Sequence, residues 1–199
     1  QSMTSYIEGS ANVEDGAIIG NGCKVWHLAH IREFAQIGEN SIIGRNVYVG
    51  PNIRIGANTK IQNNAQVYDP AEIGDGVFIG PGAILTNDVY PRAITPNGES
   101  KVDSEWDSLS VTVNEGASIG ARAVILAGVT IGQWALIGAG SVVINDILDH
   151  ALCVGNPSRQ IGWVGKAGTR LKKTENLWVC EKTEEKYEET RQGLVLVNA

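Results

Sequence analysis

Branched aliphatic residues recur at every sixth position along most of this chain. One series runs from Ile7 to Leu85 without a miss, and a second runs from Val113 to Val143. A period of six fits neither the repeat of a helix nor the alternation of a plain strand. Internal repetition of this kind is typical of solenoids, in which short coils stack along one axis. The pattern therefore predicts an all-β solenoid that is interrupted once.

Each six-residue unit has the composition of a short strand followed by a sharp turn. The aliphatic residue should point inward and its neighbours outward, because side chains alternate along a strand. Gly often follows the aliphatic residue, and we expect it to supply the permissive backbone at the corner. A small residue four places on, such as Ala29 or Cys23, should fit inside the corner. Three units then close one triangular coil of 18 residues, with coils about 4.8 Å apart.

The interruption lies between Leu85 and Val113, whose separation is not a multiple of six. It contains two prolines and many polar residues, so we predict an external loop over residues 86–112. A long loop in a regular solenoid is usually functional. The period stops at Asp149, and the segment 151–164 should lead away from the coils. We therefore expect one domain over 4–163 and a small hairpin-like extension over 164–199, with EKTEEKYEETRQ as its charged connection or a short helix.

Composition excludes several classes of function. The net charge of −6 offers no basic face for nucleic acid. No apolar run approaches the ~20 residues of a membrane span, and we expect no signal peptide before the repeat. Three irregularly spaced cysteines form no disulfide framework, which suits a cytoplasmic location. Gln1 and Ser2, ahead of Met3, are interpreted as an expression remnant.

Residues 18 apart should lie in one column on the outside of the solenoid. Three columns on one face carry polar residues up to the point where the loop departs: His27/Arg45/Asn63/Pro81, His30/Tyr48/Gln66/Ile84 and Glu33/Pro51/Asp69/Asn87. Polar columns are by default only solvated. Both histidines share this face, however, so we interpret it as a candidate site. A flat side has no deep pocket, and a cleft would need a second copy of the chain.

Five motifs go beyond the generic repeat: VWHLAHI (25–31), IQNNAQVYD (61–69), TNDVYPRA (86–93), GASIGARAVILAGVTIG (116–132) and VGNPSRQIGWV (154–164). Together they resemble the nucleotide-sugar N-acetyltransferases of the hexapeptide-repeat class. The resemblance covers residues 4–165 and is greatest to enzymes that acetylate the 3-amino group of UDP-2-acetamido-3-amino-2,3-dideoxy-glucuronic acid for bacterial surface polysaccharide. It implies a left-handed parallel β-helix and a homotrimer with acetyl-CoA in the groove between neighbouring solenoids.

The resemblance also implies roles for individual residues. Asn87 would be catalytic, because the matching Asn of the family contacts the reactive amine. Arg32 and Arg92 could pair with a substrate carboxylate or diphosphate. The other expected substrate contacts are His27, His30, Glu33, Gln66, Tyr68 and Asp69. The small residues Ala121, Ala127, Gly138 and Ala139 would let the pantetheine chain approach, and Arg159 could meet a CoA phosphate.

Two questions of mechanism and acceptor stay open at this point. A His base, as in O-acetyltransferases of the same fold, is the alternative to Asn87. On column geometry His30 lies three coils from the Asn87 level, about 14 Å along the axis, so the two cannot share one amine within a subunit. The acceptor could be a uronic acid or a neutral amino sugar, aminated at position 3 or 4, on UDP or dTDP.

Other classes built on the same kind of fold fit less well. Carbonic anhydrases need three histidine ligands at a spacing that His27, His30 and His150 do not have. Ice-binding solenoids show a regular Thr ladder, whereas the outward columns here are mixed. In resembling enzymes the C-terminal region often carries a Cys-rich zinc ribbon, but only Cys180 remains here. We therefore predict that the protein binds no metal.

Overall fold

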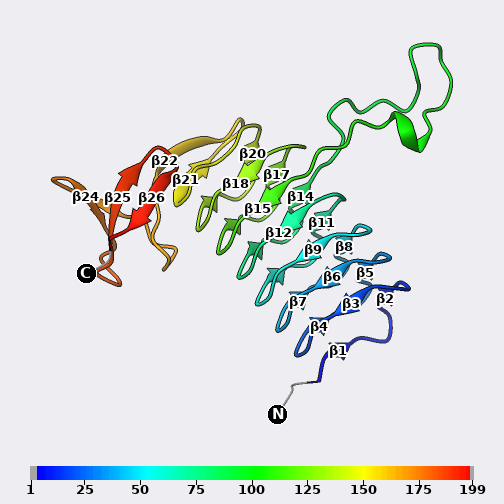
Figure 1. Cartoon of the computed structure of the whole chain (residues 1–199), viewed down its shortest axis with the longest axis horizontal. Coiled ribbons are helices and arrows are strands. Elements are labelled where there is room, and N and C mark those ends of the chain that lie inside the picture. The colour runs from blue at the N-terminus through cyan, green and yellow to red at the C-terminus, as the bar shows by residue number, and fades with distance from the viewer. Residues whose placement is uncertain (1–3, 198–199) are drawn as a thin grey trace.

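The computed structural model describes residues 4–197, so the interpretation of Gln1 and Ser2 concerns residues outside the described range. The described chain contains twenty-six strands and one short 3-10 helix. Stacked coils form a solenoid that begins near the N-terminus and ends against a small C-terminal sheet (Figure 1). A long arm projects from the middle of the stack. The predicted all-β solenoid is confirmed.

Three parallel sheets form the sides of the solenoid, which we call the first, second and third faces. The first face contains β1 (Tyr6–Ile7), β4 (Lys24–Val25), β7 (Ile42–Ile43), β10 (Lys60–Ile61), β13 (Phe78–Ile79), β16 (Ser118–Ile119), β19 (Leu136–Ile137), β21 (Ala151–Val154) and β22 (Arg159–Trp163). The second face contains β2 (Asn12–Val13), β5 (His30–Ile31), β8 (Tyr48–Val49), β11 (Gln66–Val67), β14 (Ile84–Leu85), β17 (Val124–Ile125) and β20 (Val142–Val143). The third face contains β3 (Ile18–Ile19), β6 (Gln36–Ile37), β9 (Arg54–Ile55), β12 (Glu72–Ile73), β15 (Thr112–Val113) and β18 (Thr130–Ile131).

The register of these sheets agrees with the predicted columns. On the second face His30 pairs with Tyr48, which pairs with Gln66, which in turn pairs with Ile84. Across the arm the ladder continues from Ile84 to Val124. The aliphatic residue of each unit points inward and is buried from Val25 onward, and Cys23 is fully buried as predicted. The core is therefore one continuous column of Val, Ile, Leu and Ala side chains along the axis.

The expected role of the glycine after each aliphatic residue is wrong. The left-handed backbone at the corner falls three places after the aliphatic residue, where Asn is common: Asn40, Asn46, Asn52, Asn58 and Asn64 all have φ between 55° and 63°. The glycine itself lies where two coils approach closely. A Cβ on Gly80 would lie 2.6 Å from the backbone nitrogen of Ala121. Glycine is needed there because the next coil leaves no space for a side chain.

The solenoid does not end where the six-residue period ends. Ile147 still pairs with Ile131, and β21 adds to β19 in parallel, with Cys153 opposite Ile137. The prediction that the segment 151–164 leads away is therefore wrong for β21. Ala151 and Cys153 are buried and alternate with half-buried neighbours, so a plain strand covers the open end of the core. The antiparallel strand β22 then lies along β21.

The C-terminal extension is larger than a hairpin. It is a four-stranded antiparallel sheet of β23 (Lys172–Thr174), β24 (Leu177–Val179), β25 (Lys186–Thr190) and β26 (Gly193–Leu196). The segment predicted as a charged connection or short helix contains β25 instead. Tyr187 of β25 is fully buried, and its ring lies 4.9 Å from that of His150 at the end of the solenoid. This aromatic contact holds the extension against the last coil.

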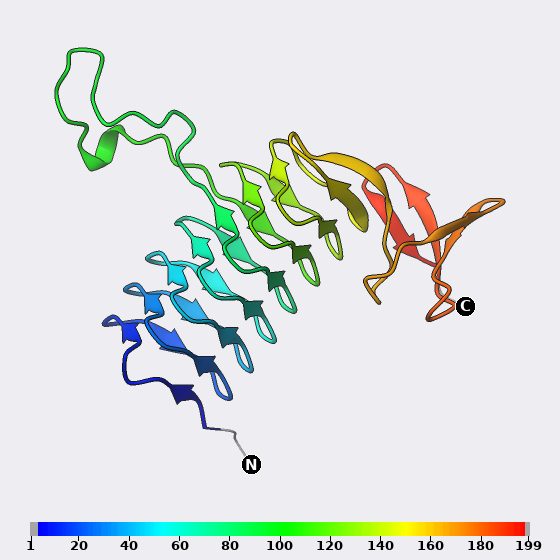
Figure 2. The ribbon, with the colours of Figure 1, turned by 180° about the vertical axis from the view of Figure 1, so that it is seen from behind.

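The arm spans residues 86–111, between β14 and β15, and leaves the solenoid where the second and third faces meet. It contains the 3-10 helix Asp103–Glu105 and two isolated antiparallel bridges, Asp88–Ser108 and Ile94–Ser100. Figure 2 shows from behind that it extends away from the coils. Among residues 4–197, no helix is long and apolar enough to cross a membrane.

Candidate functional site on the second face

The second face and its two edges carry most of the residues predicted for the site. His30 and Gln66 are the outward residues of β5 and β11, and Arg32 and Tyr68 follow the same two strands. The edge shared with the first face carries His27, Ala121, Gly138 and Ala139, and the edge shared with the third face carries Glu33, Asp69, Asn87 and Ala127. Arg92 lies on the arm and Arg159 on β22, so these two stand apart from the face.

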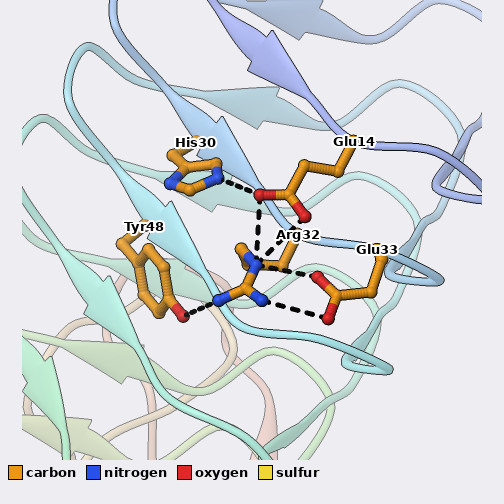
Figure 3. A network of polar contacts seen from close by, with 5 residues as sticks. All are labelled: Glu14, His30, Arg32, Glu33 and Tyr48. Carbon is orange, nitrogen blue, oxygen red and sulfur yellow. Dashed lines mark hydrogen bonds and ion pairs between the residues drawn. The ribbon is translucent and has the colours of Figure 1, made fainter.

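A network of polar contacts joins the first coils of this face (Figure 3). Nε2 of His30 lies 2.5 Å from Oε1 of Glu14. The guanidinium of Arg32 binds both oxygens of Glu33, at 2.7 Å from Nε and 3.0 Å from Nη2. Its Nε also donates to Glu14 at 3.1 Å, and Nη1 donates to the hydroxyl of Tyr48 at 3.4 Å. Five side chains from three consecutive coils therefore form one cluster.

The charges in this cluster fix its ionisation. The hydrogen bond from His30, aided by Arg32, lowers the pKa of Glu14 from 4.5 to about 2. Hydrogen bonds to Glu33, Tyr48 and Glu14 raise the pKa of Arg32. Glu14 is thus a carboxylate at neutral pH, and two carboxylates bind one guanidinium. A substrate anion at Arg32 would have to compete with both of them.

Aromatic rings continue the cluster along the face. The rings of His30 and Tyr48 meet edge to face with centroids 5.6 Å apart, and those of Tyr48 and Tyr68 lie 5.3 Å apart. Glu14 and Tyr48 were not among the predicted site residues. The sequence indicates both by their spacing, which is one coil of 18 residues: Glu14 stands 18 residues before Arg32, and Tyr48 stands 18 residues after His30.

Asn87 is positioned by its neighbours at the base of the arm. Its Nδ2 donates to the backbone oxygen of Asp69, one coil below, at 2.6 Å. Its own backbone oxygen accepts from the Leu109 N–H at 2.9 Å, which fixes the returning end of the arm. With the amide nitrogen engaged, Oδ1 is left to accept a hydrogen bond. The side chain is half-buried.

Small side chains lie directly above Asn87. Because Leu85 pairs with Ile125, Ala127 occupies the Asn87 column one coil further along. Ala127 is half-buried and Gly128 beside it has φ 82°, so the backbone at this corner is accessible. Ala121, Gly138 and Ala139 line the opposite edge of the same face. The structure therefore places only Ala127 beside the predicted catalytic residue.

A hollow of about 370 Å³ lies at the C-terminal end of the second face. Arg159 and Ser158 line it together with the loop after β20, residues 144–148. The hydroxyl of Ser158 is buried and has no hydrogen-bond partner in the described part of the chain. Nη1 of Arg159 donates to the Ser158 backbone oxygen at 3.0 Å, which leaves most of its donors available.

The remaining ionisable candidates lie elsewhere. Arg92 is exposed on the arm and donates to the backbone oxygen of Pro91. His150 is buried under the C-terminal sheet, and burial lowers its pKa. Among residues 4–197, no three His, Cys, Asp or Glu side chains gather as metal ligands. The sulfur of Cys180 instead lies 3.3 Å from the hydroxyl of Thr169.

Relatives of this chain are sugar and amino-acid acetyltransferases. A segment of 69 residues is 52% identical to dTDP-3-amino-3,6-dideoxy-alpha-D-galactopyranose 3-N-acetyltransferase of Aneurinibacillus thermoaerophilus, and covers 35% of this chain and 36% of that protein. A segment of 52 residues is 40% identical to serine acetyltransferase 4 of Arabidopsis thaliana, over 26% of this chain and 15% of that one. The chain thus matches about a third or less of the length of these relatives.

Solved structures agree on the fold. The perosamine N-acetyltransferase of Caulobacter crescentus, in complex with CoA and GDP-perosamine, superimposes with a TM-score of 0.50 at 26% identity, over 81% of this chain and 58% of that one. The acetyltransferase domain of PglB from Neisseria gonorrhoeae gives a TM-score of 0.54 at 22% identity, over 80% of this chain and 58% of that one. The profile of the bacterial transferase hexapeptide family (six repeats) matches residues 16–51, 52–87 and 110–145. Those three matches span more than half of the chain, which therefore belongs to the bacterial transferase hexapeptide family.

Proposed function

We propose that the protein is an acetyl-CoA-dependent N-acetyltransferase that acetylates the amino group of a nucleotide-linked sugar. The observation that carries this proposal is the arrangement at the base of the arm. An anchored amide, Asn87, presents its oxygen beside the small residue Ala127, which leaves space for an extended thioester. The relatives named above acetylate sugars or serine. We assign this activity to the solenoid, residues 4–163.

The reaction needs few protein groups. The neutral sugar amine attacks the thioester carbonyl, a C–N bond forms, and the C–S bond breaks as CoA leaves. Oδ1 of Asn87 accepts a hydrogen bond from the amine. This contact orients the lone pair of the amine nitrogen toward the carbonyl carbon of the thioester. An amide cannot take up the proton, which passes to the departing CoA sulfur or to water. Arg159 at the hollow beyond β20 would pair with a CoA phosphate.

The acceptor we propose is the 3-amino group of a UDP-linked 2,3-diamino uronic acid, made for bacterial surface polysaccharide. One observation favours a neutral amino sugar as the second candidate. Arg32, the predicted partner of the uronate, already binds Glu33 at two points and Glu14 at a third. A neutral sugar needs no free cation on this face. The dTDP-linked acceptor in the name of the bacillary relative is of that kind.

We propose a homotrimer as the working unit. All predicted contacts except Arg92 and Arg159 lie on a flat side or an edge of the prism, and a neighbouring solenoid would turn that edge into a cleft with acetyl-CoA in it. Three identical clefts follow from threefold symmetry. Sedimentation that showed a stable, fully active monomer would contradict this assembly.

An O-acetyltransferase with a histidine base is the second candidate activity. The contact between His30 and Glu14 favours it, because a carboxylate that accepts from one ring nitrogen orients the ring and leaves the other nitrogen able to accept a proton from a hydroxyl. Distance opposes it within one subunit, since His30 lies three coils, about 14 Å, from Asn87. The pair could act only at a site of its own or across an interface.

A thiol-release assay decides between these activities. Acetyl-CoA is offered with UDP-, dTDP- and GDP-linked sugars, each as the 3-amino, 4-amino and hydroxyl form, with and without a C6 carboxylate. We expect CoA release only with an amino form, and product that is heavier by one acetyl group. Release with the hydroxyl sugars alone would replace the proposal by the O-acetyltransferase. No release with any of them would refute both.

A further inference from the structure

The cluster on the first coils of the second face has unused hydrogen-bonding capacity. Arg32 has five N–H donors, and contacts to Glu33, Glu14 and Tyr48 use one each on Nε, Nη1 and Nη2. Two N–H donors remain, one on Nη1 and one on Nη2, and the Glu14 carboxylate at the Nε side of the guanidinium has lone pairs left to accept. Side chains of the cluster remain about a third exposed, Arg32 and Glu33 at 33%. The cluster thus presents both donors and an acceptor to the outside.

Three aromatic rings lie directly beside this polar edge. The rings of His30, Tyr48 and Tyr68 follow one another with centroids 5.6 and 5.3 Å apart. Tyr68 is 38% exposed, so one side of its ring is open to a ligand. A flat, uncharged ring can stack there at little entropic cost.

The charges exclude a phosphate from the same place. Glu14 and Glu33 together outweigh Arg32, so the cluster has no excess of positive charge. A diphosphate would meet like charges there. The ligand that fits is an uncharged planar ring with both donors and acceptors on one edge. Nucleobases are recognised in this way, by stacking on aromatic residues and by hydrogen bonds to the Watson–Crick edge.

We propose that this cluster binds the pyrimidine base of the nucleotide-linked sugar. Uracil and thymine carry two carbonyl oxygens and an N–H on one edge, for which Arg32 has two N–H donors left and Glu14 has an acceptor left. Guanine has two adjacent donors instead and fits less well. The inference rests on the proposed function, because it assigns the base of the same substrate whose amine lies at Asn87.

The spacing along the solenoid agrees with one extended substrate. The ladder His30, Tyr48, Gln66 and Ile84 puts three coils between the cluster and the Asn87 level, about 14 Å. A ribose and two phosphates separate the base from the sugar in such a substrate, and they would bridge this interval. The base and the amine then lie on one face, at opposite ends of the polar columns.

Isothermal titration with UDP, dTDP and GDP tests the assignment without turnover. We expect UDP and dTDP to bind more tightly than GDP. Tyr68→Ala should weaken UDP binding about tenfold or more, the usual effect of losing a stacking partner. Glu14→Gln should weaken it as well, because the amide offers one acceptor where the carboxylate offers two. Tyr6→Ala is the matched control, an exposed tyrosine on the first face, and should leave the Kd for UDP unchanged.

The outcomes separate this site from the proposed activity. UDP binding that is equal in wild type, Tyr68→Ala and Glu14→Gln would place the base elsewhere, while thiol release with amino sugars would still support the N-acetyltransferase. GDP binding as tight as UDP binding would overturn the pyrimidine assignment. If none of the three nucleotides binds, both the base site and the proposal that the acceptor sugar is nucleotide-linked are refuted.

Discussion

Asn87 donates a hydrogen bond from Nδ2 to the backbone oxygen of Asp69, 2.6 Å away and one coil below. The two residues are 18 apart in sequence and share an outer column, so the bond runs along the solenoid axis. It orients the Asn87 amide with its nitrogen toward the earlier coil and its oxygen free. An asparagine held in this way can serve as a fixed acceptor at the point where the arm departs.

Replacing Asn87 by alanine should remove catalysis and little else. A contact that orients the reacting group typically contributes about 10²–10³ in rate, so kcat should fall by that factor. The side chain is half-buried and makes one hydrogen bond, to Asp69, so the free energy of unfolding should fall by only about 1 kcal/mol and the affinity for CoA should stay close to wild type. Steady-state kinetics and calorimetry measure all three. Asn21→Ala, an exposed asparagine at a corner away from the second face, is the matched control and should retain full activity.

His30→Ala should act on binding rather than on the chemical step. If His30 holds only a distant part of the substrate, its loss raises the acceptor KM and leaves kcat nearly unchanged. The measurement is kcat at saturating acceptor. Turnover that disappears in His30→Ala but persists in Asn87→Ala would establish histidine as the base and contradict the mechanism proposed above.

The arrangement of the coils could be predicted because every repeat has the same six-residue period. Once the coil length is known, residues such as His30, Tyr48 and Gln66 must share a column, and the structure pairs them. The same arithmetic applied backward from Arg32 leads to Glu14. Glu14 was not predicted because it belongs to none of the five motifs and lies four coils before the loop at residue 86.

Features outside the period could not be derived in this way. The glycine after each aliphatic residue is needed because the next coil comes close to it. That distance between two coils cannot be derived from the local sequence pattern. The C-terminal sheet has no repeat, and its main anchor joins His150 to Tyr187, which are far apart in sequence. Whether the columns face a partner also depends on surfaces of a second copy.

Gly80→Ala should destabilise the solenoid. The new Cβ would lie 2.6 Å from the Ala121 nitrogen and 2.8 Å from the Ile119 oxygen, so two coils would have to separate. Overpacking of this kind costs about 1–3 kcal/mol. Chemical denaturation gives the free energy of unfolding. Gly9→Ala, where nothing lies within 4 Å of the new Cβ, is the control and should stay within about 0.5 kcal/mol of wild type.

The C-terminal sheet should hold together without metal. Tyr187 is buried, its hydroxyl donates to Glu185 at 2.9 Å and accepts from the Lys166 N–H at 3.1 Å, and Cys180 pairs with Thr169. These contacts join the strands of the sheet and the segment before it by packing and hydrogen bonds. Elemental analysis of the purified protein should give less than one zinc per ten chains, and EDTA should leave the melting temperature unchanged. Stoichiometric zinc would show that the remaining cysteine is part of a metal site after all.

Glu14 should give the protein a pH-dependent increment of stability. Its pKa is about 2 in the folded chain, because His30 and then Arg32 stabilise the carboxylate, against 4.5 ordinarily. The unfolded state therefore binds the proton more readily than the folded state. The increment is complete above about pH 4.5 and is lost progressively as the pH falls toward 2. Denaturation midpoints of wild type and Glu14→Gln should differ most near pH 6 and converge toward pH 3. Glu99→Gln, on the exposed arm, should match wild type throughout. A difference between wild type and Glu14→Gln that stays constant or grows on acidification would mean that the charge of Glu14 is not what stabilises the first coils.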